Sequence, residues 1–308
     1  MELSVVTTLY QSEHYIREFH ERTTAAISNL GISDYEIVFV NDGSPDRSLE
    51  IAVEISKKDP KVVVVDLSRN FGHHRAIMTG LAHSTGELIF LIDSDLEEEP
   101  EWMISFKEQM DREKCDVVYG VQKRRKGRFF ERISGTIFYA LFKLFSKVEV
   151  TENMIITRLM SRRYVNALLE YKEKEIYIPG LWSITGFDQR FQIINKHSSS
   201  TSTYTFTRKI SLFVNSITAF SNTPLLLIFY TGCLILLIAL IYSAYLVIDH
   251  LFFSIKLTGW TSMIVSIWFL GGLNMAFLGI IGIYLSKVFS ETKQRPYSTV
   301  RHIYRSGS

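Results

Sequence analysis

Two aspartates separated by one residue have the types and spacing to bind a divalent cation. Asp93 and Asp95 follow a short apolar run at residues 88–92, and Glu97 stands two positions further on. Hard cations such as Mg²⁺ and Mn²⁺ prefer carboxylate oxygens and commonly bridge substrate phosphates. A lone Asp-x-Asp arises easily by chance, so its position directly after an apolar run is the informative feature. We therefore predict Asp93, Asp95 and Glu97 as metal ligands, with Mg²⁺ or Mn²⁺ as the cofactor.

The acidic residues after this pair have a second interpretation. Residues 97–101 hold four glutamates, and an acidic run is favoured at the start of a helix by the helix dipole. We assign Glu98, Glu99 and Glu101 to such a helix start. For the two aspartates we prefer a functional role, because uncompensated carboxylates at the rim of a sheet are costly without a cation.

Short apolar runs indicate the elements that position these side chains. Four runs rich in β-branched residues are bounded by turn residues, at positions 3–8, 36–40, 62–65 and 88–92. Such runs are typical of buried parallel strands, and the segments between them have helical spacing. Ser44 and Pro45 suit the N-cap and first position of one of these helices. The repeated order of strand and helix predicts an α/β fold with a doubly wound, Rossmann-like sheet.

Polar clusters follow two more of the expected strands. Residues 41–46 have the sequence Asn-Asp-Gly-Ser-Pro-Asp, and residues 68–75 include Arg69-Asn70-Phe71-Gly72. Ligands of a doubly wound sheet bind outside the carboxyl ends of the strands. The two clusters and the acidic pair are therefore expected to converge on one rim.

Several classes of site are excluded by what the expected strands lack. No Gly-x-Gly-x-x-Gly or P-loop lysine pattern follows any of them, and neither a serine-hydrolase elbow nor zinc-type spacing is present. Residues 1–195 carry 25 basic and 30 acidic groups, a net charge of −5 that does not suit a nucleic-acid surface. The interpretation that remains is a metal-assisted nucleotide site.

Two long stretches contain no charged residue. Residues 225–248 and 260–285 are 24 and 26 residues long, and about 20 apolar residues suffice for a helix to cross a bilayer. Three basic residues lead into the first stretch, whereas five basic residues and one acid follow the second, giving +3 and +4. By the positive-inside rule, residues 1–205 and both termini face the cytoplasm. We predict a transmembrane hairpin over residues 225–286, in an integral protein of the bacterial cytoplasmic membrane. Two buried core helices of a soluble protein are the alternative.

The flanks of the hairpin complete the expected domain organisation. Residues 206–224 have apolar residues at helical spacing and are predicted to form a juxtamembrane amphipathic helix, and residues 287–308 form a cytoplasmic basic tail. Small residues of the second stretch indicate close contact between helices: Gly271, Gly272, Ala276, Gly279 and Gly282. Asn274 has the same interpretation, with a path for a polar substrate as the alternative.

Taken together, the polar clusters resemble those of the family 2 glycosyltransferases with the GT-A fold. The similar branch is the polyprenyl-phosphate glycosyltransferases, which include dolichol-phosphate mannose synthases and bactoprenol glucosyltransferases. Residues 40–48 resemble the family's base and ribose site, residues 69–72 its second signature and residues 93–101 its metal motif. The resemblance covers almost the whole chain, because later landmarks match at residues 158–160, 179–181, 185–187, 220–225 and 295–297.

The resemblance implies roles for individual residues. The nucleotide sugar is expected at Tyr10, Asp42, Asn70 and Asp93, and catalysis at Asp95, Arg132 and Arg158. The acceptor phosphate is expected at Arg128, Arg132, Ser134 and Arg158, since arginine presents a fork of donors to phosphate oxygens. Residues 123–126 add basic charge nearby, and a solvated face or a contact with anionic lipid is an equal alternative for them.

Four positions depart from the family pattern. Glu97 replaces the usual Gln, the loop at residues 8–13 is a loose match, and Ser202-Thr203-Tyr204 lacks a lysine. Ile156-Thr157 stands where the family has Asp-Phe, so a carboxylate sometimes proposed as the base is missing. A phosphate monoester has a second pKa near ~6 and is largely anionic at neutral pH. The acceptor therefore needs little help from a base.

The reaction that the resemblance implies is glycosyl transfer with inversion. A monosaccharide would move from a nucleotide sugar, expected to be a UDP-sugar, to polyprenyl (undecaprenyl) phosphate at the cytoplasmic membrane face, for modification of cell-envelope glycans. The resemblance also implies a homo-oligomer such as a tetramer, and no nucleic-acid partner. Two alternatives stay open, namely a transferase that extends a saccharide acceptor and a non-catalytic membrane scaffold that binds nucleotide sugars.

Overall fold

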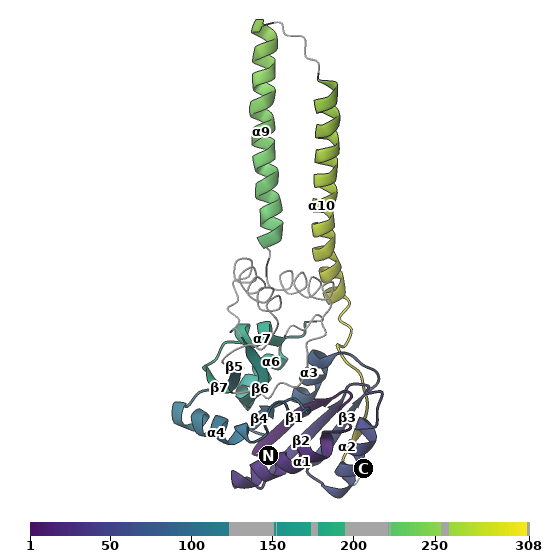
Figure 1. Cartoon of the computed structure of the whole chain (residues 1–308), viewed down its shortest axis with the longest axis vertical. Coiled ribbons are helices and arrows are strands. Elements are labelled where there is room, and N and C mark those ends of the chain that lie inside the picture. Colours follow the sequence, from purple (N-terminus) through teal and green to yellow (C-terminus); the bar gives the residue numbers. More distant parts are fainter. Residues whose placement is uncertain are drawn as a thin grey trace. The chain divides into compact units, whose positions relative to one another are not determined.

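The chain forms two units, which are described separately. The computed structural model describes residues 1–122, 151, 153–173, 178–194, 221, 223–253 and 259–306. The first unit is an α/β domain built from Met1–Tyr139, Val148–Tyr204 and Arg295–Ser308. The second unit is helical in its described residues and comprises Ala140–Lys147 and Thr205–Gln294 (Figure 1).

One mixed sheet forms the centre of the α/β unit. Its strands are β1 (Leu3–Leu9), β2 (Tyr35–Asn41), β3 (Val62–Leu67), β4 (Leu88–Leu91), β5 (Val117–Gln122), β6 (Met154–Ser161), β7 (Gln189–Ile194) and β8 (Val300–Tyr304). They lie in the order β7-β5-β6-β4-β1-β2-β3-β8. The four strands expected from the apolar runs are β1 to β4, which pair in parallel. Strand β6 runs antiparallel to β4 and β5, and β8 runs antiparallel to β3. The predicted α/β class is confirmed.

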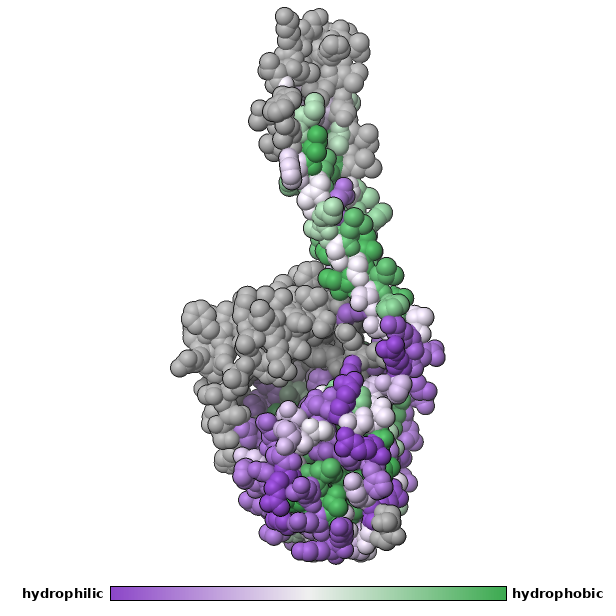
Figure 2. Space-filling view, turned by 90° about the vertical axis from the view of Figure 1, so that its right-hand side faces the viewer, coloured by the Kyte–Doolittle hydropathy of each residue, from purple (hydrophilic) through white to green (hydrophobic). Residues whose placement is uncertain are grey.

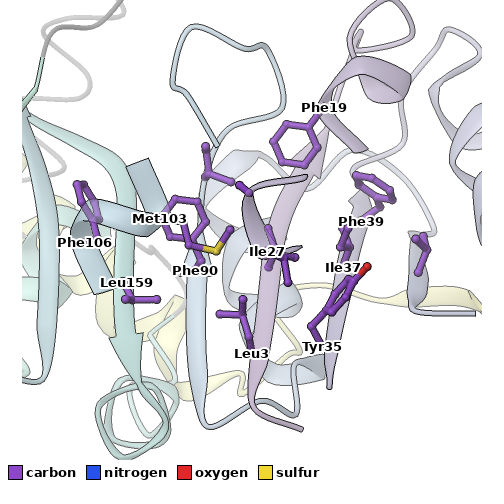
Figure 3. Packing of buried hydrophobic residues seen from close by; sticks show 14 of the residues in the cluster. Leu3, Phe19, Ile27, Tyr35, Ile37, Phe39, Phe90, Met103, Phe106 and Leu159 are labelled. Carbon is purple, nitrogen blue, oxygen red and sulfur yellow. The ribbon is translucent and has the colours of Figure 1, made fainter. Parts of the chain in front are cut away.

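Helices cover both faces of this sheet because successive strand residues point to opposite sides. One apolar cluster joins β1 residues such as Val5 to α1 (Ile16–Asn29), α2 (Ser48–Lys58) and α4 (Trp102–Glu113). Figure 3 shows Phe19, Phe39, Met103 and Phe106 in this cluster. The opposite cluster joins the next β1 residue, Val6, to further helices: α3 (His73–His83), α6 (Arg162–Leu169) and α7 (Ile178–Ile184).

The start of α2 differs from the sequence expectation. Ser44 and Pro45 were predicted to begin this helix, but it begins at Ser48. The hydroxyl of Ser44 instead accepts the N–H of Gln11 at 2.8 Å and donates to Asp46 at 2.5 Å. The Ser44 side chain therefore serves the loops at the ends of β1 and β2 and is not available to cap a helix.

The helical unit contains two long apolar helices, α9 (Thr223–Phe253) and α10 (Trp260–Thr292). By length and apolarity, Ser266–Thr292 is the one described segment suited to crossing a membrane, whereas Thr223–Ala239 is apolar but shorter. In Figure 2 the described surface of this unit is largely hydrophobic, in contrast to the mostly hydrophilic surface of the α/β unit. The second predicted span stays a prediction. The juxtamembrane helix expected at 206–224 lies almost entirely outside the described residues.

The glycines of α10 were predicted to lie in close contact with another helix. No described atom lies within 4 Å of a Cβ built at Gly271, Gly272, Gly279 or Gly282. Large side chains of the same helix are exposed, with Trp268 at 79% and Met275 at 74%. Among the described residues no atom packs on these four glycines, and the close helix contact stays a prediction.

Candidate active site at the carboxyl ends of the strands

The loops that follow β1, β2, β3 and β4 form the candidate site. These four parallel strands share one direction, so the loops at their carboxyl ends meet at one edge of the sheet. The predicted residues Tyr10, Asp42, Asn70 and Asp93 each lie in a different one of these loops. The convergence expected from the polar clusters is therefore present.

Asp42 joins two of these loops. Its side chain is 2% exposed, and its two carboxylate oxygens accept the N–H groups of Phe71 at 2.7 Å and Gly72 at 3.0 Å. Burial raises the pKa of Asp42, and these two backbone donors partly offset that effect. In this structure the Asp42 carboxylate shapes the loop at residues 69–72, and its predicted contact with the nucleotide sugar stays a prediction.

A second set of hydrogen bonds connects the loops after β1 and β2. The Asp46 carboxylate accepts the hydroxyl of Ser44 and the backbone N–H groups of Glu13 at 3.1 Å and Ser48 at 3.0 Å. Partial burial alone would raise the pKa of Asp46, but these bonds outweigh it and lower the pKa to about 2. Tyr10 lies beside this network with 49% of its surface exposed. The network holds the loops in place and leaves Tyr10 accessible to a ligand.

The acidic pair after β4 lies next to a histidine that the sequence analysis did not assign to the site. His73 Nε2 is 3.4 Å from a carboxylate oxygen of Asp93, and its Nδ1 is 3.0 Å from the hydroxyl of Thr8. The surrounding protein partly removes His73 from water and so lowers its pKa, although 42% of its side chain is exposed. Nearby carboxylates oppose that shift. The sequence could have pointed to His73, because it directly follows the motif at residues 69–72 and begins the next helix, α3.

Asp93 and Asp95 fit the oxygen chemistry of a divalent cation, but the three predicted ligands do not form a complete set by themselves. The Asp95 carboxylate is on an exposed residue and accepts the N–H of Glu97 at 3.0 Å. Within the described part of the chain, no three His, Cys, Asp or Glu side chains are grouped to hold a metal ion. Proteins nonetheless commonly provide Mg²⁺ with only one or two carboxylates, and waters and substrate phosphates supply its other ligands.

Glu98 has a different place from the one expected. It was assigned to an acidic helix start, but α4 begins at Trp102 and Glu98 is 1% exposed. Its carboxylate accepts the N–H of Thr157 at 3.1 Å and also the Thr157 hydroxyl. The helix-start interpretation of Glu98 is therefore wrong, because a buried carboxylate requires hydrogen-bond donors and Thr157 supplies them.

Arg158 is fully buried in β6. Its guanidinium packs on the Trp182 ring, and its Nε donates to the carbonyl of Ile156 at 3.3 Å. Burial lowers the pKa of Arg158 to about 9, so the group stays charged at neutral pH. Among the described residues, Arg158 Nη1 and Trp182 Nε1 have no hydrogen-bond partner. The predicted roles of Arg158 in catalysis and acceptor binding stay predictions.

The remaining acceptor residues cannot be placed. Arg128, Arg132 and Ser134, with the basic residues 123–126, lie outside the described residues, as does the segment 202–204.

Comparisons of the sequence with known proteins indicate one family. The model of the family described as "Glycosyl transferase family 2" matches residues 4–184. A Mycobacterium tuberculosis protein named "Putative glycosyltransferases" is 49% identical over 99% of this chain and 89% of its own length. The "Bactoprenol glucosyl transferase" of Shigella phage SfX is 32% identical over 96% of this chain and 97% of its own. A "Prophage bactoprenol glucosyl transferase homolog" of Escherichia coli is 31% identical over 98% and 99%. Because the family model matches more than half of the chain and these relatives align with nearly all of it, the chain belongs to glycosyl transferase family 2.

Proposed function

We propose that this protein transfers a monosaccharide, with inversion, from a UDP-sugar to polyprenyl phosphate at the cytoplasmic face of the bacterial membrane. The product would serve the modification of cell-envelope glycans. The observation that carries the proposal is the full-length similarity to proteins named bactoprenol glucosyl transferases, which extends over at least 96% of this chain and so includes the helical unit.

The sheet topology supports the membrane arrangement. Strand β8 follows α10 in sequence yet pairs with β3 of the α/β unit. A chain that leaves the sheet and returns to it must cross a bilayer an even number of times. If α10 crosses, a second segment must cross as well, and α9 is the long apolar helix available. This argument favours a hairpin with both termini on the same side.

The proposed chemistry forms one bond and breaks one. An oxygen of the lipid phosphate attacks the anomeric carbon of the sugar, and the bond from that carbon to the diphosphate oxygen breaks as UDP leaves. The acceptor is already largely anionic at neutral pH, so no proton has to be removed by the protein. The main task of the protein is to hold two anionic reactants in line. The loops after β1, β2 and β3 are suited to binding the nucleotide.

The acidic pair is suited to a metal cofactor in this reaction. Asp93 and Asp95 would hold Mg²⁺ or Mn²⁺, with Glu97 beside them. A bound cation supplies positive charge that stabilises the departing diphosphate. The Glu97 N–H restrains the Asp95 carboxylate, and His73 restrains Asp93. These contacts orient both side chains before a ligand binds.

A transfer assay tests the proposal. Purified full-length protein in lipid nanodiscs is mixed with radiolabelled UDP-sugars, Mg²⁺ or Mn²⁺ and undecaprenyl phosphate, and the chloroform-soluble label is measured. We expect a lipid-linked product that EDTA abolishes. Asp95→Asn should lower the rate by about 10²-fold or more, as loss of a charge-stabilising group does in other enzymes. Asp111→Asn, an exposed carboxylate on α4, is the control and should leave the rate unchanged. No product with any donor would contradict the proposal.

The departure at Ile156 keeps one alternative in view, a nucleotide-sugar sensor without turnover. Calorimetry with UDP-sugars separates the two functions, because a sensor binds the donor but neither hydrolyses nor transfers it. A saccharide-extending transferase would instead label a free oligosaccharide in competition with the lipid phosphate. A homo-oligomer stays a prediction of the family resemblance.

A further inference from the structure

The segment after the second membrane helix is part of the α/β sheet. Strand β8 pairs antiparallel with β3, and Asp66 lies opposite His302 in the register. Just before the strand, the backbone carbonyl of Thr299 accepts the N–H of Ser68 at 2.9 Å. The hydroxyls of Ser298 and Thr79 are 2.6 Å apart. Figure 1 shows this yellow segment alongside the sheet. The sequence predicted a basic tail here, with a family landmark at residues 295–297, but no strand.

One side chain of β8 contacts the carboxyl end of β3 and the start of the loop that follows it. The guanidinium of Arg301 lies 3.4 Å from Oδ2 of Asp66 and donates to the carbonyl of Ser68 at 2.6 Å. Asp66 is 1% exposed, and among the described residues its Oδ2 accepts no hydrogen bond. A buried carboxylate is costly without a compensating charge. Arg301 provides that charge from the far end of the chain.

Hydrogen bonds connect Asp66 to the loop after β2. Its Oδ1 accepts the Asn41 side-chain amide at 2.8 Å, and the amide oxygen of Asn41 accepts the N–H of Ser44 at 3.3 Å. Asn41 is 2% exposed, so its amide has few alternative partners. Ser44 in turn binds Gln11 and Asp46 through its hydroxyl. A continuous set of polar contacts therefore joins Arg301 to the loops after β1 and β2.

The contact with Ser68 reaches the other loop. Ser68 precedes Arg69-Asn70-Phe71-Gly72, and the N–H groups of Phe71 and Gly72 bind Asp42. Holding the Ser68 carbonyl and N–H fixes where this loop leaves β3. Strand β8 therefore holds the loop after β3 directly, and it is connected to the loop after β2 through Asp66 and Asn41.

We propose that Arg301 is a positioning residue for the nucleoside diphosphate and that β8 completes the donor site from beyond the membrane helices. This inference rests on the proposed function. Because coupling between two sites is reciprocal, seating of β8 raises nucleotide affinity and nucleotide binding in turn stabilises β8.

Nucleotide binding by two variants that each lose one arginine charge tests this role. UDP binding is measured by calorimetry on full-length protein in nanodiscs. We expect Arg301→Gln to weaken UDP binding about tenfold, within the usual range for coupled sites, and to raise the KM for the donor while kcat changes less than about twofold. Arg301→Lys should restore part of the affinity. Arg305→Gln removes the same charge just after the strand and should bind UDP as the wild type does.

A double-mutant cycle separates positioning from general destabilisation. If Arg301 acts through Ser44, the affinity loss of Arg301→Gln combined with Ser44→Ala is smaller than the product of the two single losses. Independent effects would multiply, and that result would overturn the inference. Unchanged UDP affinity in Arg301→Gln would overturn it as well.

Hydrogen exchange gives a test that needs no variant. In the wild type, adding UDP should slow exchange of the backbone amides of residues 298–304, and unchanged exchange at saturating UDP would contradict the inference. Failure of the proposed function has a different signature, because the wild type would then bind no nucleotide in a panel of UDP, GDP and their sugars. If the wild type binds UDP and Arg301→Gln binds it with the same affinity, the positioning role is refuted but the proposed function is not.

Discussion

At the scale of single residues, the carboxylates near the site are held by specific donors. Asp42 accepts two backbone N–H groups, Asp46 accepts hydroxyl and backbone donors, and Glu98 accepts the N–H and hydroxyl of Thr157. Asp95 differs because its residue is exposed. The buried and partly buried carboxylates thus build the loops, whereas Asp95 remains accessible to a ligand.

The pairing of Glu98 with Thr157 leads to a prediction about stability. Thr157→Val keeps the side-chain shape but removes the hydroxyl, which leaves the buried Glu98 carboxylate with one donor fewer. We expect a loss of about 1–3 kcal/mol in the free energy of unfolding, measured by thermal unfolding of the full-length protein in detergent. Thr157→Ser retains the hydroxyl and is the control. Equal unfolding midpoints for Thr157→Val and the wild type would contradict this account of Glu98.

At the scale of elements, the loops after β2 and β3 approach so closely that a side chain does not fit between them. Gly43 has a positive φ of 58°, and a Cβ at this position would lie 2.5 Å from the backbone N of Asn70. Gly31 at the end of α1 also has a positive φ, 69°, but nothing lies within 4 Å of its Cβ position. A comparison of the two glycines therefore distinguishes the effect of the left-handed backbone, which both share, from the effect of the close contact, which only Gly43 has.

Alanine at these glycines should therefore have different effects. Each substitution costs about 1–2 kcal/mol for the left-handed conformation. Gly43→Ala also forces the two loops apart, so we expect UDP affinity to fall by more than about tenfold, or about 1.4 kcal/mol. Gly31→Ala should bind UDP within about twofold of the wild type. Calorimetry on both variants checks this, and equal affinities would mean that loop separation does not matter for nucleotide binding.

At the scale of the whole molecule, the return of the chain to β8 constrains membrane topology. The N-terminal strands and β8 belong to one sheet, so the proposed membrane hairpin requires both termini to lie on the same side of the bilayer. We expect protease to cleave epitope tags at both termini in inside-out vesicles and neither tag in right-side-out vesicles. Cleavage of the two tags in opposite vesicle types would exclude the hairpin and would be incompatible with the pairing of β8.

Local patterns in the sequence were sufficient to predict much of this molecule. The β-branched runs correspond to β1 through β4, the charge-free stretches correspond to α9 and α10, and the polar clusters converge at the strand ends. Each of these features depends on residues that are close in sequence, through alternation, helical period or uninterrupted apolarity. The motifs at residues 40–48, 69–72 and 93–101 also sufficed to predict the family.

The tertiary structure alone decided which distant residues meet. Glu98 finds its donors on Thr157, Asp42 shapes the loop at residues 69–72, and Arg301 reaches Ser68 across 233 positions of the chain. No local period encodes such contacts, since each arises when separate elements pack and a buried polar group must find a partner. The sequence by itself thus determined the first four strands, the two long apolar helices, the acidic pair and the family. Tertiary packing decided that Glu98 is buried and that β8 completes the sheet, because both depend on pairing across the folded domain.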